Sequence, residues 1–205
     1  MKHYPDMIPI FPLSGVIYFP KTNLPLNIFE QRYLDLINEA YNKDKLMGMV
    51  QTKRESNSVY KVGCLGKIND YHKSKDGRIL INLTGITRFE IIEEIKNQKL
   101  YREFNVNYEM FKGDITDIKE KVESSHLIEK AKIFFRRCGL LLNWKEFDKL
   151  DCIQKINTLA MISPVTNEEK QKILETVGLD DKIKTLENII HFYLHEVNFD
   201  NSTIQ

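Results

Sequence analysis

Four of the chain's six prolines fall within one apolar stretch near the N-terminus, and this stretch most constrains the fold. Pro9, Pro12, Pro20 and Pro25 are spaced among large apolar side chains in the segment 8–28. Because proline has no N–H to donate and its φ is fixed, within sheets it is confined to strand starts, edges and bulges. The segment therefore predicts short, bent strands that turn the corners of a small barrel.

The apolar pattern becomes helical at Asn27–Glu30, which predicts one early helix over residues 30–42. Between residues 46 and 111 apolar and polar side chains alternate, as they do in half-buried strands. The dipeptide Asp76-Gly77 within this region favours a tight hairpin turn. Together these patterns predict a β-barrel of about six strands with one helix.

After Asp114 the apolar residues recur at helical spacing, and we expect four helices. The first two should span about 114–138 and 145–162, and the second should stop before Pro164. Thr166 and Asn167 supply the N-cap of the third helix, and the fourth should end near residue 197. The predicted fold class is thus α+β, with a barrel followed by a four-helix bundle. The predicted domains are 1–111 for the barrel, 112–199 for the bundle and 200–205 for a loose tail.

Three stretches carry a resemblance to a known family. The run IPIFPLSGVIYFPKTNLPLNIFEQRY at residues 8–33 resembles the opening of the Lon substrate-binding domain, the N-terminal domain of Lon-type ATP-dependent proteases. Residues 83–91 and 167–175 extend the resemblance over nearly the whole chain. This domain also occurs alone in short bacterial proteins. The resemblance implies a PUA-like pseudo-barrel and recognition of unfolded or partly unfolded protein substrates.

Composition excludes several classes of function. The 30 basic and 29 acidic residues give a net charge of +1, which argues against a dedicated nucleic-acid binder. The three cysteines form no C-x-x-C pair, so neither a zinc site nor a disulfide framework is indicated. The N-terminus lacks the apolar core of a signal peptide, and no stretch is long and apolar enough to cross a membrane. We therefore expect a cytoplasmic protein without a cofactor or a membrane partner.

No catalytic machinery is evident in the sequence. None of the nine glycines belongs to a phosphate-binding loop that ends in Gly-Lys-Ser/Thr. A serine–lysine peptidase dyad would lie in a separate domain for which the chain is too short. Ser14 precedes Gly15 in a proline-flanked turn, where a turn residue is expected rather than a nucleophile. The chain is therefore predicted not to be an enzyme.

Two further patterns admit a functional interpretation beside a structural one. His191 and His195 are four residues apart and could bind a metal along one helix face, but no third ligand is identifiable, so no metal site is predicted. Four basic residues lie toward the end of the first bundle helix. They either form a solvated helix face or bind RNA or a nucleotide, and the second possibility is the alternative function. The four are Lys130, Lys132, Arg136 and Arg137.

The leading hypothesis is a non-catalytic protein-binding module that acts as an adaptor or as a sensor of unfolded protein. Its partners would be unfolded polypeptides and a Lon-type protease. Methionine and aromatic side chains on strands or loops suit such promiscuous contacts, although packing in the core is the competing interpretation for each. Glu30 and Arg32 are expected to have structural roles, Glu30 at the start of the helix and Arg32 paired with a carboxylate of the barrel. The candidate peptide-binding residues are Tyr18, Phe19, Met47, Met49, Tyr71 and Phe111.

Overall fold

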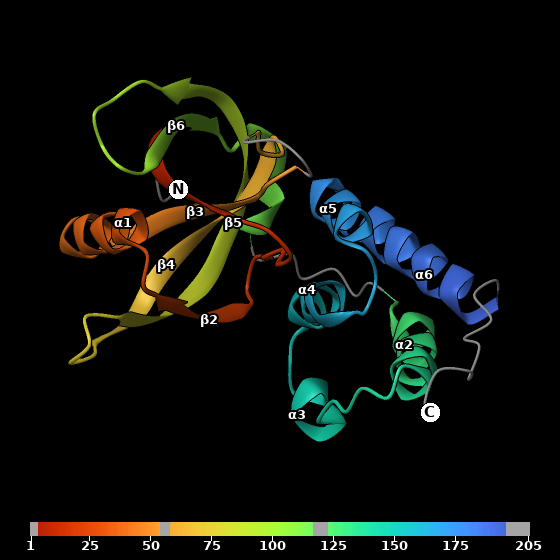
Figure 1. Ribbon diagram of the computed structural model, residues 1–205. Coiled ribbons are helices and arrows are strands. Elements are labelled where there is room, and N and C mark those ends of the chain that lie inside the picture. The colour runs from red at the N-terminus through yellow and green to blue at the C-terminus, as the bar shows by residue number, and fades with distance from the viewer. Residues whose placement is uncertain (1–3, 54–57, 117–122, 196–205) are drawn as a thin grey trace. The chain divides into compact units, whose positions relative to one another are not determined.

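The computed structural model describes residues 4–53, 58–116 and 123–195 of the chain (Figure 1). Contacts divide the chain into two compact units, residues 1–119 and residues 120–205, which we call the β unit and the helical unit. The predicted boundaries at 111/112 and 199/200 stay predictions, and the predicted tail 200–205 lies outside the described residues.

Six strands form one sheet in the β unit, and five of them close into a ring. β3 pairs with β4, β4 with β5, and β5 with β6 in antiparallel fashion; β6 pairs with β1, and β1 returns to β3 in parallel. β2 adds to the outside of this ring by pairing with β5. The predicted α+β fold with about six strands is confirmed. The strands are β1 (Met7–Leu13), β2 (Asn23–Ile28), β3 (Leu46–Gln51), β4 (Val62–Lys73), β5 (Ile79–Ile95) and β6 (Arg102–Asn107).

The length of β5 allows the barrel to close. Its first residues, 79–84, lie between β2 and β4, whereas its last residues, 90–95, pair with β6. Register shifts along the β4–β5 and β5–β6 pairs let the strand bend between these neighbours. Inward-facing apolar side chains of five strands fill the interior. This core cluster consists of Ile8, Ile10, Val50, Leu65, Phe89, Phe104 and Val106.

The early helix α1 (Gln31–Asn42) agrees with the predicted segment 30–42. Its buried residues Tyr33, Leu36, Ile37 and Ala40 recur three and four positions apart, so they form one apolar face. Glu30 occupies the N-cap position with an extended backbone, but its side chain makes no capping hydrogen bond. The helix therefore begins where the sequence indicates, with Glu30 at its start but without a capping contact from the Glu30 side chain.

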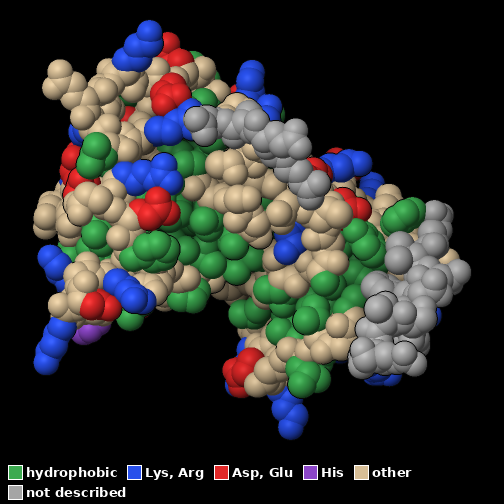
Figure 2. Space-filling model, viewed as in Figure 1, with side chains coloured by type: hydrophobic (Ala, Val, Ile, Leu, Met, Phe, Trp, Pro, Cys, Tyr) green, Lys and Arg blue, Asp and Glu red, His purple; other side chains and the backbone are tan. Residues whose placement is uncertain are grey.

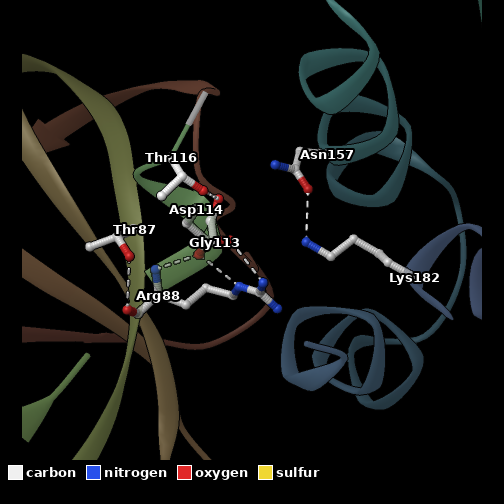
Figure 3. Close-up of polar contacts among 7 residues, drawn as sticks. All are labelled: Thr87, Arg88, Gly113, Asp114, Thr116, Asn157 and Lys182. Atoms are coloured by element: carbon white, nitrogen blue, oxygen red, sulfur yellow. Dashed lines mark hydrogen bonds and ion pairs between the residues drawn. The ribbon is translucent and has the colours of Figure 1, made fainter. Parts of the chain in front are cut away.

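The described part of the helical unit contains five helices, where the sequence predicted four. α6 packs against α2, α4 and α5. Inside the unit, Lys182 of α6 is 3% exposed and donates a hydrogen bond of 3.1 Å to Oδ1 of Asn157 on α4 (Figure 3). This contact ties two helices together through polar groups. The helices are α2 (Ser125–Arg137), α3 (Trp144–Asp148), α4 (Cys152–Ile162), α5 (Asn167–Glu175) and α6 (Leu179–His195).

Local capping explains where the helices differ from the prediction. The expected helix 145–162 is broken because Asp151 forms a capping box with Gln154 and starts α4 anew. The expected helix 114–138 begins only at Ser125, since Ile115 and Thr116 follow a 3-10 helix; residues 117–122 lie outside the described part. The apolar spacing runs across both interruptions, so periodicity alone did not reveal them.

Candidate functional site

A cleft of about 740 Å³ on the β unit is assembled by the proline-rich stretch itself. The end of β1, the end of β2 and the start of α1 form most of its wall, and β6 and the end of β5 complete it. We call it the motif cleft. Figure 2 shows hydrophobic side chains gathered on the visible face of the β unit beside basic and acidic ones. The cleft is lined by Phe11, Pro12, Leu13, Ser14, Leu26, Asn27, Ile28, Phe29, Glu30, Arg32, Tyr33, Thr52, Glu94 and Arg102.

Aromatic side chains form the apolar part of the motif cleft. The rings of Phe11 and Tyr33 are both buried and lie 4.2 Å apart between centroids. The Tyr33 hydroxyl donates to the carbonyl oxygen of Pro12 at 3.4 Å, which links α1 to β1. Phe29, by contrast, is 67% exposed at the junction of β2 and α1. The cleft thus combines a packed aromatic floor with one large apolar side chain available for contact.

Two arginine–glutamate pairs line the same cleft. Arg102 donates two hydrogen bonds to Glu94, at 2.7 and 2.6 Å, between β6 and β5. Arg32 pairs with Glu30 at 2.8 Å and lies over the ring of Tyr33. The expectation that Arg32 pairs with a carboxylate of the barrel was wrong, because the nearest carboxylate belongs to the helix N-cap. Both pairs are partly solvent-exposed, so they can exchange partners at little cost.

The Arg102–Glu94 pair has a consequence for acid titration. Hydrogen bonds from Arg102 hold the pKa of Glu94 below its ordinary value, although partial burial opposes them. The pair therefore stabilises the fold above the ordinary carboxyl pKa of about 4.3, and this contribution is lost as the pH falls through the lowered pKa. We expect the NMR titration of the Glu94 carboxyl carbon to have a low midpoint that rises in Arg102→Gln. An unchanged midpoint in that variant would contradict the assignment.

The outer edge of β2 borders the motif cleft, and among the described strands β2 pairs with β5 only. The N–H of Gly85 donates to the carbonyl of Thr22 at 2.9 Å. From Thr22 onward, the backbone N–H and C=O groups of every second residue therefore point toward β5. Pro25 consequently falls on the outward side, where its missing N–H weakens any added strand. A bound segment would therefore be held mainly by side chains of the cleft.

A second, more apolar cleft of about 990 Å³ lies between β5, β6 and the 3-10 helix η1 (Glu109–Asp114). Ile92 and Ile115 on its wall are exposed. Tyr108 is partly buried, and its hydroxyl donates to the carbonyl oxygen of Pro5 at 2.9 Å. The cleft combines this apolar area with polar and charged side chains, among them Asp6, Asn107, Glu109 and Lys112.

One buried ion pair holds η1 onto the barrel (Figure 3). Arg88 of β5 donates through Nε and Nη2 to the carboxylate of Asp114, at 2.9 and 2.8 Å. Its backbone N–H donates to the same carboxylate at 2.9 Å, and its guanidinium lies over the ring of Phe111. The contacts of Arg88 with Asp114 and Phe111 therefore hold η1, which forms one wall of the second cleft, against the barrel.

The six residues predicted to bind peptide are not gathered at one surface. Tyr71 alone is partly exposed, with its ring stacked on Tyr41 at 4.4 Å and its hydroxyl donating to Asn38. Their role in binding stays a prediction, whereas Phe29, which sequence reasoning did not single out, is exposed in the motif cleft. The buried five are Tyr18, Phe19, Met47, Met49 and Phe111.

The basic residues of α2 are largely engaged within the helical unit. Lys130 pairs with Glu187 at 3.3 Å, and Arg137 donates to the carbonyl oxygen of Leu194 at 2.6 Å. Lys132 lies over the ring of Trp144. Contacts of this kind fit a structural role of these side chains. Neither these contacts nor the comparisons support the alternative of RNA or nucleotide binding.

His191 and His195 lie side by side on α6, with ring centroids 4.3 Å apart. Within the described residues no group of three or more histidine, cysteine or acidic side chains is arranged to hold a metal ion. In the same part of the chain, no helix is both long enough and apolar enough to cross a membrane.

Comparisons with solved structures support the fold. The Lon N-terminal domain protein from Xanthomonas campestris matches 88% of this chain and 96% of its own, with a TM-score of 0.64 and 19% sequence identity. The N-terminal domain of Mycobacterium avium complex Lon protease matches 90% of this chain and 98% of its own, with a TM-score of 0.62 and 16% identity. The fold is thus that of Lon N-terminal domains.

Sequence comparisons give the family. The Lon protease of Syntrophus aciditrophicus is 27% identical over 93% of this chain, and that of Dictyoglomus thermophilum is 26% identical over 88%. The chain spans about a quarter of the length of these relatives, 25% and 24% respectively. A family model for the ATP-dependent protease La (LON) substrate-binding domain matches residues 7–191. The chain therefore belongs to the Lon substrate-binding domain family.

Proposed function

We propose that this chain recognises protein substrates in an unfolded or partly unfolded state, without catalysing a reaction itself. The observation that carries the proposal is the family match over residues 7–191, whose diagnostic N-terminal stretch builds the motif cleft. In this proposal the chain acts either as an adaptor that passes its substrates to a Lon-type protease or as a sensor of unfolded protein. A cytoplasmic location, favoured by the scattered free cysteines, belongs to the same proposal.

The chemistry of the motif cleft suits an unfolded segment better than one defined small molecule. Phe29 and the aromatic floor can cover apolar side chains of varied shape. The two arginine–glutamate pairs offer both signs of charge and can bind polar groups of the substrate backbone or of its side chains. Such a surface selects exposed apolar sequence without requiring one particular residue order.

Binding to a permanently unfolded protein tests the proposal. Reduced and carboxymethylated α-lactalbumin, labelled with a fluorophore, should bind the chain, whereas folded α-lactalbumin should not. Phe29→Ser should weaken binding by about tenfold or more, because covering a phenylalanine contributes about 1.5–3 kcal/mol. Fluorescence anisotropy measures both affinities.

The matched control is Leu100→Ser. Leu100 is 64% exposed on the same unit but does not line the motif cleft, and its loop is anchored by the bond of 2.6 Å between Lys99 and Glu39. This variant should bind like the unchanged chain. Equal affinity for folded and unfolded α-lactalbumin would refute the proposed function. Equal losses of affinity in Phe29→Ser and Leu100→Ser would refute the motif cleft as the binding site.

A further inference from the structure

The connection between α2 and α3 exposes three consecutive leucines. Leu141 is fully exposed, Leu140 is 40% exposed and Leu142 is partly buried. The connection starts at Gly139, whose φ of +67° suits the residue that ends a helix. A run of exposed apolar residues is uncommon on soluble proteins unless another surface covers it.

These leucines form one wall of a groove of about 400 Å³ in the helical unit. Aromatic side chains form the rest of its apolar lining. Phe135 and Trp144 meet edge to face with centroids 6.0 Å apart, and Trp144 in turn meets the buried Phe147 at 5.3 Å. The groove is lined by Lys132, Phe135, Arg136, Gly139, Leu140, Leu141, Leu142 and Trp144.

The charges of the groove have one sign. Lys132 and Arg136 line it, and none of the described residues in its lining is acidic. Lys132 lies over the Trp144 ring with 5.3 Å between Nζ and the centroid, which holds its charge at the groove. Arg136 is exposed on the last turn of α2. The nearby Glu146 of α3 is paired with Lys149 at 2.7 Å.

We propose that this groove, which we call the leucine groove, docks an acidic apolar segment of a protein partner. A large apolar side chain of the partner would enter between Leu141 and Trp144, and an aspartate or glutamate within a few residues would meet Arg136. A hollow of this size fits a side chain better than it fits a flat lipid surface. The leucine groove is separate from the motif cleft, so the two proposals can fail independently.

Trp144 reports on the leucine groove directly, because it is the chain's single tryptophan. The probe is a short synthetic peptide with a Leu-Phe core flanked by aspartate and glutamate. Its addition should shift Trp144 fluorescence to shorter wavelength in a saturable manner. A peptide of the same core with lysine in place of the acidic residues should bind at least about tenfold more weakly, since it places like charges together.

Variants localise the effect. Leu141→Ser and Arg136→Glu should each lower the affinity for the acidic peptide several-fold. Val177→Ser and Lys184→Glu, which change exposed residues elsewhere on the same unit, should leave this affinity unchanged. The proposal is overturned if the acidic peptide leaves Trp144 fluorescence unchanged, or if the lysine peptide binds equally well. A saturable shift with phosphatidylserine vesicles or single-stranded RNA, but not with the acidic peptide, would also overturn it.

Discussion

Replacing Asp114 with alanine is expected to lower the free energy of unfolding by about 3–5 kcal/mol. Arg88 is 2% exposed and Asp114 is 11% exposed, so the variant would keep a buried guanidinium without this carboxylate. It would also lose the bond from the Arg88 backbone N–H, at 2.9 Å, that holds the end of η1 against β5. Urea denaturation of the full chain, followed by circular dichroism, measures the change.

Glu109→Ala is the matched control for this prediction. Glu109 lies in the same 3-10 helix and pairs with Lys112, but both side chains are exposed, so its removal should cost at most about 1 kcal/mol. The double variant Arg88→Met with Asp114→Leu should recover part of the lost stability, because apolar side chains of similar size need no partner, whereas the bond from the backbone N–H of residue 88 stays lost. Similar losses for Asp114→Ala and Glu109→Ala would show that burial of the pair is unimportant.

The sequence predicted those elements that local signals determine. Asp76-Gly77 marks the turn between β4 and β5, and Gly77 adopts the positive φ of 89° that such turns require. Thr166 caps α5 by accepting from the N–H of Glu169. The apolar face of α1 likewise follows from spacing alone. Each of these signals lies within a few residues of the element that it specifies.

Contacts between distant residues could not be predicted in the same way. Closure of the barrel depends on the pairing of β1 with β6, about 95 residues apart, which no local pattern encodes. Arg88 belongs to the stretch 83–91 that resembled the family, yet its partner Asp114 is 26 residues away. The sequence therefore indicated a barrel without showing which polar residues hold it together.

The candidate site was harder to predict than the fold for a physical reason. Alternation shows that a strand has two faces, but both faces of a closed barrel can be covered, and Met47 and Met49 of β3 proved to be buried. Phe29 lies between a strand and a helix, where neither period applies, and it is exposed. Exposed apolar side chains at such junctions are visible only when the neighbouring elements have been placed.

Gly85→Ala is expected to destabilise the chain by about 3 kcal/mol, at the upper end of the usual cost of overpacking. A Cβ at this position would lie 2.2 Å from the carbonyl oxygen of Phe19 and 3.0 Å from Cα of Pro20. Both atoms belong to the backbone, so they cannot move aside by rotating a side chain. The β5 strand and the proline-rich stretch must separate to admit even one methyl group.

Gly48→Ala provides the comparison, because its Cβ would meet the ends of side chains, the nearest being Cδ1 of Ile10 at 2.4 Å. A methyl group at the end of an isoleucine can shift, so this variant should lose less stability in urea denaturation than Gly85→Ala. Separation at Gly85 should also break its hydrogen bond with Thr22, measured as faster hydrogen exchange of the Gly85 amide. If Gly48→Ala proved the more damaging, or the amide of residue 85 stayed protected in Gly85→Ala, the close approach of these backbones would not be what makes Gly85 necessary.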